Sequence, residues 1–208
     1  MKILAFSDIH RDLGAVEAFA VRARASDVLV GAGDFATRRE GLQPVIDALA
    51  ALGRPTVLVC GNAESPDELQ SACARFEHLH VLHASSVELE GLTFFGLGGA
   101  IPPTPFGQWS VDFDETQADH WLDRCPRGCV LVTHSPAYGH CDRTSAGKCV
   151  GSRAVLACVE RCRPALVFSG HVHDAWGQSS EFGPTRLYNV GPRALQVELS
   201  SPATGTPR

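Results

Sequence analysis

The sequence has no long apolar run. None of its hydrophobic segments approaches the roughly 18 residues that a membrane-spanning helix requires. The N-terminal segment MKILAFSDIH carries one Lys and a short apolar run that ends in charge, without the longer apolar region and small-residue cleavage site of a secretory signal. We therefore expect a cytoplasmic protein that does not bind membranes.

The sequence also has no block or stripe of basic residues. It carries 18 Lys and Arg residues against 23 Asp and Glu residues, for a net charge of -5. Proteins that bind long nucleic acid neutralise many backbone phosphates with Lys and Arg, so this composition counts against that class of partner. A single nucleotide or a short oligonucleotide in a pocket is still compatible with it.

The eight cysteines include no C-x-x-C pair and match no zinc-ribbon spacing. Cys158 and Cys162 stand four residues apart on an expected helix, and Cys125 and Cys129 bracket an expected turn. Because no export signal is present, we expect reduced thiols, and we interpret each cysteine as a small buried hydrophobic side chain.

The chain has 208 residues, of which 44% are hydrophobic, and this suffices for one domain with a sizeable core. We assign residues 1–199 to this domain and expect a disordered tail at 200–208. Three successive β-α units at the start imply a mostly parallel sheet with right-handed crossovers. Their strands are predicted at 2–7, 27–32 and 55–60, and their helices at 13–24, 42–52 and 66–76.

The rest of the chain changes pattern after residue 76. A Gly/Pro-rich loop is expected at 98–107, and the irregular segment 135–150 is long enough to suggest a functional loop. Helices are predicted at 114–125 and 151–163, and short strands at 80–82, 86–89, 92–97, 129–132, 165–169, 187–190 and 194–199.

Five of the apolar runs end in Asp, Asn or His. The clearest example is Gly170-His171-Val172-His173, which directly follows the strand at 165–169. Alone, each of these residues would more often be a surface side chain, a helix cap or a turn residue. Because ligands gather at the C-terminal ends of parallel strands, the joint pattern predicts a metal site. Its candidate ligands are Asp8, His10, Asp34, Asn62, His134, His171 and His173.

This donor set contains four nitrogen and three oxygen ligands, too many for one four-coordinate ion. It suits two ions that share a bridging carboxylate. Imidazole and carboxylate ligands without thiolate favour Zn, Mn or Fe over Ca or Mg. Two such ions about 3.5–4 Å apart can hold a bridging hydroxide and two phosphate oxygens. The site therefore suits the hydrolysis of a phosphate ester.

The segments Asp8-x-His10, Gly33-Asp34, Gly61-Asn62, His134 and Gly170-His171-x-His173 resemble the five blocks of the calcineurin-like metallophosphoesterase superfamily. The resemblance extends from Ile3 to about Leu199. It implies an α/β fold, a four-layer αββα sandwich with mostly parallel central strands and a dimetal site at the C-terminal strand ends. The small size and the His134-Ser-Pro segment are similar to the small prokaryotic phosphodiesterases of this superfamily.

The resemblance also implies a role for each ligand. Asp8, His10 and His173 would hold one metal, Asn62, His134 and His171 the other, and Asp34 would bridge them. Catalysis would then work through the metals by way of Asp34, Asn62 and His134. Mn is the preferred metal, with Fe, Zn, Ni and Co as alternatives.

One position departs from the family pattern. Many members read Gly-Asn-His at the third block, and that His is thought to help the leaving group depart, whereas this chain has Ala63. We therefore predict a slower enzyme that favours good leaving groups. His140 in the long loop is a candidate substitute acid. Arg143 and Lys148 are candidate ligands of the substrate phosphate, with solvated loop charges as the alternative.

The preferred function is a phosphodiesterase for small diesters or nucleotides. A phosphomonoesterase, nucleotide pyrophosphatase or nuclease on the same site is the first alternative. The second is a non-catalytic metal-bound scaffold, because a scaffold subunit of the retromer coat is built on this superfamily's fold. The presence of all seven ligands counts against a scaffold, which does not need them, whereas Ala63 in place of His favours a scaffold. A homodimer through exposed edge strands is left open.

Overall fold

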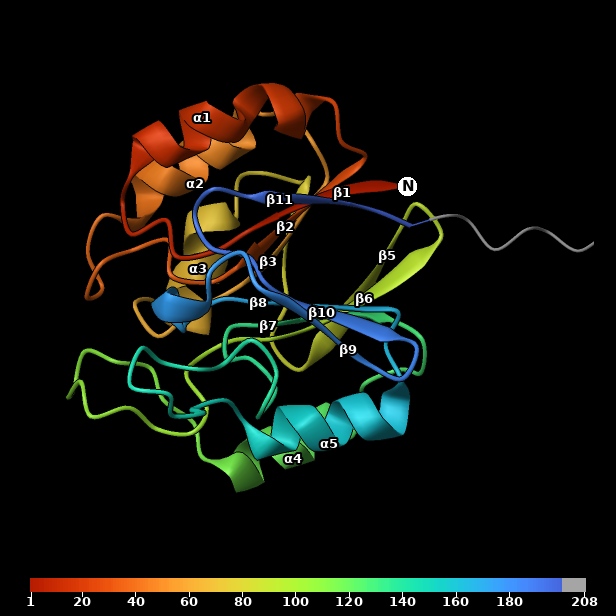
Figure 1. Cartoon of the computed structure of the whole chain (residues 1–208). Helices are drawn as coiled ribbons and strands as arrows, with labels where there is room; N and C mark the ends of the chain where they lie inside the picture. The colour runs from red at the N-terminus through yellow and green to blue at the C-terminus, as the bar shows by residue number, and fades with distance from the viewer. Residues whose placement is uncertain (200–208) are drawn as a thin grey trace, which may run out of the picture.

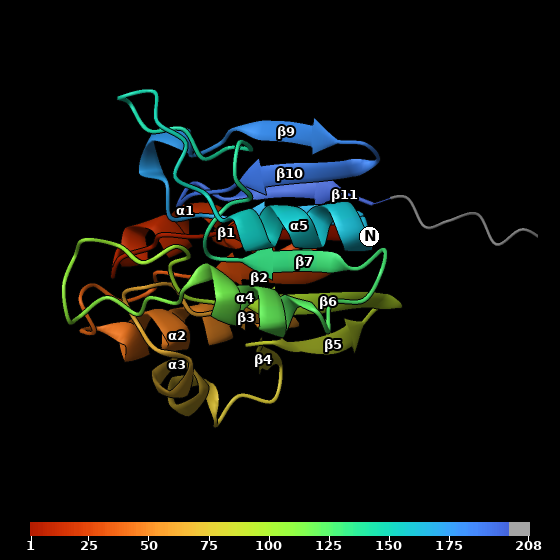
Figure 2. The same cartoon turned by 90° about the horizontal axis from the view of Figure 1, so that it is seen from below.

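Two β-sheets pack face to face, and helices cover the outer face of each, so the chain forms four layers (Figures 1 and 2). The computed structural model describes residues 1–199, and the tail predicted at 200–208 lies outside the described residues. The expected αββα sandwich is confirmed. Among residues 1–199, no helix is long and apolar enough to cross a membrane.

The first sheet has the strand order β11-β1-β2-β3-β4. β1 to β4 are parallel, and only β11 runs antiparallel to its neighbour. Its strands are β1 (Lys2–Phe6), β2 (Val28–Ala32), β3 (Thr56–Val59), β4 (Leu79–Val81) and β11 (Leu195–Glu198). The outer face is covered by α1 (Leu13–Arg24), α2 (Leu42–Ala50) and α3 (Pro66–Cys73).

The second sheet has the order β5-β6-β7-β8-β10-β9, with antiparallel strands at both edges. Its central strands β6, β7, β8 and β10 are parallel. The strands are β5 (Ser85–Leu89), β6 (Leu92–Leu97), β7 (Val130–Thr133), β8 (Leu166–Ser169), β9 (Ser179–Phe182) and β10 (Thr185–Asn189). Its outer face is covered by α4 (Glu115–Leu122) and α5 (Arg153–Cys162).

The central strands are buried on both faces, and this explains their continuous apolar sequences. In β1, Leu4 and Phe6 pack against the helices, whereas Ile3 and Ala5 face the other sheet. The layer between the sheets is built in the same way from both sides. It contains Val30, Val57, Phe94, Val132 and Phe168.

Local capping signals place the helix starts where the sequence predicts them. Asp12 accepts a hydrogen bond from the backbone amide of Ala15, and Ser65 forms a capping box with Glu68. Two elements were not predicted. β9 is an edge strand of mostly polar sequence, and a short 3₁₀-helix, η1, spans His173–Ala175. Edge strands need no apolar run because one side is open to solvent.

Candidate metal centre

The seven predicted ligands lie together where the two sheets meet. Each follows the C-terminal end of a parallel strand. Three of these strands, β1, β2 and β3, belong to the first sheet, and β7 and β8 belong to the second. The ligands therefore approach from both halves of the sandwich. They are Asp8 and His10 after β1, Asp34 after β2, Asn62 after β3, His134 after β7, and His171 and His173 around the end of β8.

The backbone turns sharply at these strand ends. Asp8, His10, Asp34 and His171 have φ values of 54°, 45°, 58° and 67°, in the left-handed region that residues other than glycine seldom occupy. Such strain is of order 1–3 kcal/mol per residue and is typical of functional sites. Glycines make room beside them. A Cβ at Gly61 would collide with Oδ1 of Asp34.

One group of ligands surrounds His173. Its Nε2 lies 3.6 Å from Oδ1 of Asp8 and 3.4 Å from Nε2 of His10. The same nitrogen of His10 lies 3.5 Å from Oδ2 of Asp34. Four donor atoms from three segments thus converge on one point.

A second group surrounds the fully buried His134. Its Nε2 lies 3.2 Å from both Oδ1 of Asn62 and Nδ1 of His171. It also lies 3.5 Å from Oδ1 of Asp34. Asp34 therefore directs one carboxylate oxygen toward each group, which is the placement that a bridging ligand needs.

Hydrogen bonds set the tautomers of two of the imidazoles. Nδ1 of His10 lies 3.1 Å from the carbonyl of Ala36, and Nδ1 of His134 lies 2.8 Å from the carbonyl of Ala32. Because a carbonyl only accepts, each Nδ1 carries the proton and each Nε2 presents a lone pair to the site. Lone pairs and carboxylate oxygens face one another there, so the donor set fits divalent cations.

The electrostatics of the site favour positive charge. Burial opposes ionisation of Asp8, but the hydrogen bond with His173 and the charge of His134 lower its pKa to about 2. Burial by itself would lower the pKa of His134, but the negative charges of Asp34 and Asp8 raise the pKa above its usual value. Burial and the nearby charge of His134 lower the pKa of His171 to about 3, which keeps that ring neutral and able to bind a cation.

Glu64 supports the bridging ligand from behind. Its Oε1 accepts hydrogen bonds from the backbone amides of Asp34 at 2.9 Å and Gly61 at 2.7 Å. Its Oε2 accepts a hydrogen bond from the backbone amide of Ala36 at 2.9 Å. Burial and the charge of Asp34 raise its pKa to about 7. The carboxylate thus joins the strand ends of β2 and β3. Glu64 is therefore a partner of the ligand segments.

Trp176 is a supporting residue that sequence reasoning missed. Its indole Nε1 donates to Oδ2 of Asp8 at 3.0 Å, and its ring packs on His173 with centroids 4.2 Å apart. Ser7 donates to the same carboxylate oxygen at 2.5 Å. No local signal marks Trp176, because its partner lies 168 residues away.

Ala63 occupies the position at which the family resemblance implies His. Its side chain is buried, and its backbone amide donates to Oδ1 of Asp34 at 2.8 Å. The backbone therefore helps to hold the bridging carboxylate, while the methyl group cannot transfer a proton.

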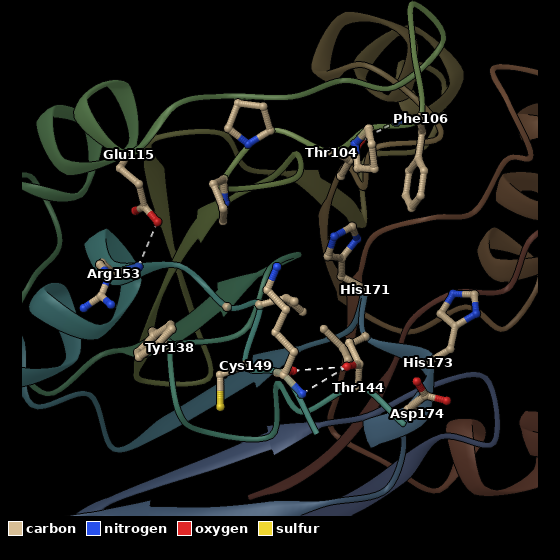
Figure 3. Close-up of a pocket in the computed structure, with 17 residues that line it drawn as sticks. Thr104, Phe106, Glu115, Tyr138, Thr144, Cys149, Arg153, His171, His173 and Asp174 are labelled. Atoms are coloured by element: carbon tan, nitrogen blue, oxygen red, sulfur yellow. Dashed lines mark hydrogen bonds between the residues drawn. The ribbon is translucent and has the colours of Figure 1, made fainter. Parts of the chain in front are cut away.

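A pocket opens beside His171 and His173 (Figure 3). The loop 102–106 forms one wall, with three prolines and Phe106, and Tyr138 stands opposite. Arg153, which sequence reasoning missed, stacks its guanidinium on the Tyr138 ring at 4.2 Å. It begins α5, where Ser152 caps the helix. The pocket thus combines apolar walls with a few charged groups.

The structure brings only one of the three loop candidates to this pocket. Lys148 lines it. Arg143 instead donates to the carbonyl of Gly147 at 3.2 Å and borders a neighbouring hollow. Nδ1 of His140 lies 3.1 Å from the Ser180 hydroxyl, and its ring packs edge-on against Phe182. His140 is therefore directed to β9 and not to the metal ligands, contrary to its expected role as substitute acid.

A family model described as calcineurin-like phosphoesterase matches residues 1–175, the segment that holds all seven candidate ligands. The UPF0046 protein K07C11.7 of Caenorhabditis elegans is 28% identical over 209 residues, which cover 91% of this chain and 69% of the relative.

Two solved structures share the fold. The protein TT1561 of Thermus thermophilus superposes with a TM-score of 0.76 at 19% identity, covering 92% of this chain and 90% of its own. A dimetal phosphatase from Danio rerio superposes with a TM-score of 0.62 at 14% identity, covering 92% and 88%. At these identities the likeness establishes a common architecture.

Proposed function

The chain belongs to the calcineurin-like phosphoesterase family of dimetal-dependent phosphoester hydrolases, and on that premise we propose that it is a phosphodiesterase for small diesters or nucleotides. One observation carries the proposal: seven ligands form two groups that share Asp34, directly beside an open pocket. A scaffold would not need this complete set.

The residues assigned to the two metals follow the two groups. Asp8, His10 and His173 would hold one ion, and Asn62, His134 and His171 the other, with one oxygen of Asp34 for each. Two divalent ions bound there would supply the Lewis-acid chemistry that activates a water and neutralises charge on a phosphate. Mn is our preferred metal, with Fe, Zn, Ni and Co as alternatives, because the donors are imidazoles and oxygens.

The chain's own residues supply orientation and charge. The carbonyls of Ala32 and Ala36 hold two imidazoles with Nε2 directed into the site. Glu64 holds the backbone of Asp34. Lys148 and Arg153 bring positive charge to the pocket beside His171, where the phosphate would enter. Binding and reaction would therefore occur at the boundary between the ligands and the pocket.

The pocket walls favour a diester over a monoester. A diester carries one negative charge and an organic substituent on each side. The apolar wall at 102–106 and the Tyr138 ring offer a surface for such a substituent. Within residues 1–199, Lys148 and Arg153 are the only Lys or Arg side chains that line the pocket, which suits a singly charged phosphate. Because Ala63 cannot protonate the leaving group, substrates with good leaving groups would react fastest.

We place the enzyme in the cytoplasm. All eight cysteines are free thiols, and seven of them are buried. Unpaired sulfurs in such numbers are typical of a reducing compartment.

The test is hydrolysis of bis-p-nitrophenyl phosphate beside p-nitrophenyl phosphate. Chelator-stripped protein would receive Mn, Ni, Co, Zn or Mg in turn. We expect diester turnover that returns with metal. Turnover of the monoester alone would favour a phosphatase. Absence of turnover with two ions bound would favour the scaffold, for which Ala63 is the supporting observation.

A further inference from the structure

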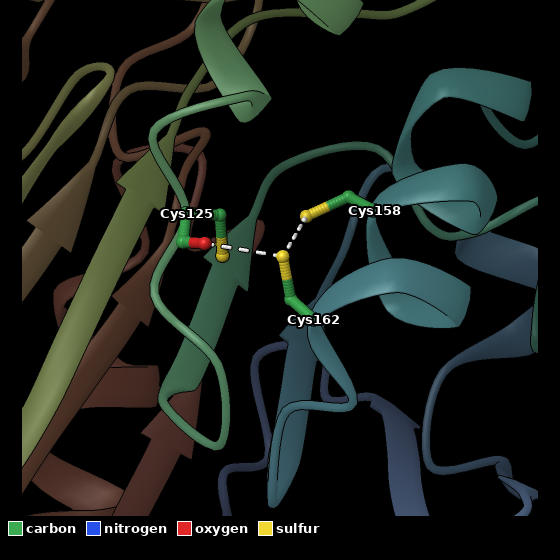
Figure 4. A group of neighbouring side chains, drawn as sticks. All are labelled: Cys125, Cys158 and Cys162. Carbon is green, nitrogen blue, oxygen red and sulfur yellow. Dashed lines mark hydrogen bonds between the residues drawn. The ribbon is translucent and has the colours of Figure 1, made fainter.

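Four cysteines gather beneath the outer helices of the second sheet, away from the candidate metal centre. Cys129 directly precedes β7, whereas His134 directly follows it, so the cysteines lie at the opposite end of this strand. Cys125 belongs to the connection between α4 and β7, and Cys158 and Cys162 lie on α5 (Figure 4). All four are buried.

Three of the four sulfur atoms converge closely. Those of Cys125, Cys158 and Cys162 all lie within 4.8 Å of one another. The Sγ atoms of Cys158 and Cys162 are 4.0 Å apart. Cys129 adds a fourth Sγ, which lies 3.5 Å from that of Cys125 but outside this group of three, so its side chain would have to turn toward Cys158 and Cys162 to complete four ligands. A tetrahedral zinc site with Zn–S bonds of about 2.3 Å separates its sulfurs by about 3.8 Å.

We propose that Cys125, Cys129, Cys158 and Cys162 bind one structural zinc ion. Four sulfur ligands leave no open coordination position, and burial keeps substrate away, so the ion would have a structural and not a catalytic role. It is distinct from the dimetal centre, whose donors are nitrogen and oxygen. The soft sulfur ligands select zinc over Mn or Mg.

The chain presents these sulfurs as two C-x-x-x-C pairs. In α5 this spacing places Cys158 and Cys162 on one face, a single turn apart. Cys125 and Cys129 bracket the turn into β7, and Cys125 meets that face. Apolar packing alone requires no such meeting of sulfurs. Disulfides are excluded in this state, because S–S bonds are about 2.05 Å long.

Arg161 lies beside the cluster and would offset part of the charge of a tetrathiolate site. Arg161 interacts electrostatically with Cys158 and Cys162, and it donates to the carbonyl of Leu122 at 2.8 Å. Arg127 donates to the carbonyl of Arg161 at 2.8 Å.

Zinc binding replaces thiol protons with metal bonds. The thiol of Cys162 now donates to the carbonyl of Cys125 at 3.1 Å, and that hydrogen bond would be exchanged for a sulfur–zinc bond. The four thiols would release four protons to solvent as one divalent ion enters. The ion would then tie the α4–β7 connection to the last turn of α5, within the apolar layer that covers the second sheet.

The test uses the full-length protein loaded with Co(II). Cobalt bound by thiolates gives a sulfur-to-metal charge-transfer band in the near ultraviolet, whereas cobalt bound by nitrogen and oxygen ligands gives none. We expect this band in the wild type, and a clearly weaker band or none in Cys125→Ser, Cys129→Ser and Cys158→Ser, because its intensity rises with the number of Co–S bonds. Cys73→Ser is the matched control, because Cys73 is equally buried but lies in α3 over the other sheet. That variant should keep the band.

Three outcomes would overturn the proposal. The first is a wild-type protein without the band, a result that does not depend on whether any variant folds. The second is a band of unchanged intensity in Cys129→Ser, which would show that Cys129 is not a ligand. The third is a titration of six thiols, and not eight, after unfolding in chelator, which would indicate a disulfide. Because none of these readouts uses turnover, the result is independent of the proposed phosphodiesterase activity.

Discussion

The carboxylate of Glu64 accepts the backbone amide of Asp34 at 2.9 Å, and through this contact it holds the residue that faces both ligand groups. The same oxygen accepts the amide of Gly61, next to Asn62. One side chain therefore sets the relative position of two strand ends. Outer-sphere contacts of this kind orient metal ligands.

Glu64→Gln should weaken this arrangement. In the wild type both carboxylate oxygens of Glu64 accept hydrogen bonds from backbone N–H groups. The Gln side chain keeps one acceptor oxygen, but its NH₂ group is a donor and would leave one of these N–H groups without an acceptor. An unsatisfied buried donor costs about 1–3 kcal/mol, and loss of an outer-sphere contact weakens metal binding about 10- to 100-fold. Thermal unfolding and calorimetric metal titration would measure both effects. The control is Glu68→Gln, outside the site. Unchanged metal affinity in Glu64→Gln would refute the supporting role.

Asn62→Ala and His171→Ala should each remove a ligand from the group around His134. We expect the loss of one metal per chain and a fall in kcat of more than about 100-fold, beyond the 10- to 100-fold typical of outer-sphere changes. Metal analysis and diester kinetics would measure these. His140→Ala is the control, since that ring faces Ser180, and it should retain activity. Full activity in either ligand variant would contradict the assignment.

Ala63 predicts a strong dependence on the leaving group. General acid catalysis contributes about 10²–10⁴-fold where a leaving group needs a proton, and this site has no acid at position 63. Nitrophenyl diesters should therefore react far faster than alkyl diesters. Measured kcat/KM values for a series of leaving groups would test this. Similar rates on both kinds of diester would mean that another residue supplies the proton.

Lys148 and Arg143 form a matched pair of loop cations. Only Lys148 lines the pocket, whereas Arg143 is turned toward Gly147. Lys148→Ala should raise KM for the diester about 3- to 10-fold, equivalent to roughly 0.7–1.4 kcal/mol, with a small change in kcat. Arg143→Ala should change KM by less than about twofold. Steady-state kinetics on one diester would compare them, and the reverse order would show that the loop rearranges on binding.

The strands, helices and metal ligands could be predicted because they depend on local patterns. Apolar runs predicted most strands of both sheets, and apolar residues at helical spacing predicted the helices, two of which Asp12 and Ser65 cap. β9 was not predicted because its mostly polar sequence gives no apolar run, and its strand conformation depends on pairing with β10. Residues such as Trp176 and Arg153 escaped it because their partners lie far away in sequence or across a loop.

By itself the sequence determined the β-α units of the first sheet and the candidate ligand set, because parallel strands bring their C-terminal ends together. The αββα sandwich was an expectation from the resemblance to the family. Tertiary structure alone decided which loop residues reach the pocket, and it directed Lys148 into it and His140 toward β9. It also brought Cys125 to Cys158, 33 positions along the chain, although no zinc-ribbon spacing marks them. The physical reason is common to these cases. A side chain outside regular structure takes its direction from contacts with distant segments, and such contacts exist only once the sheets have packed.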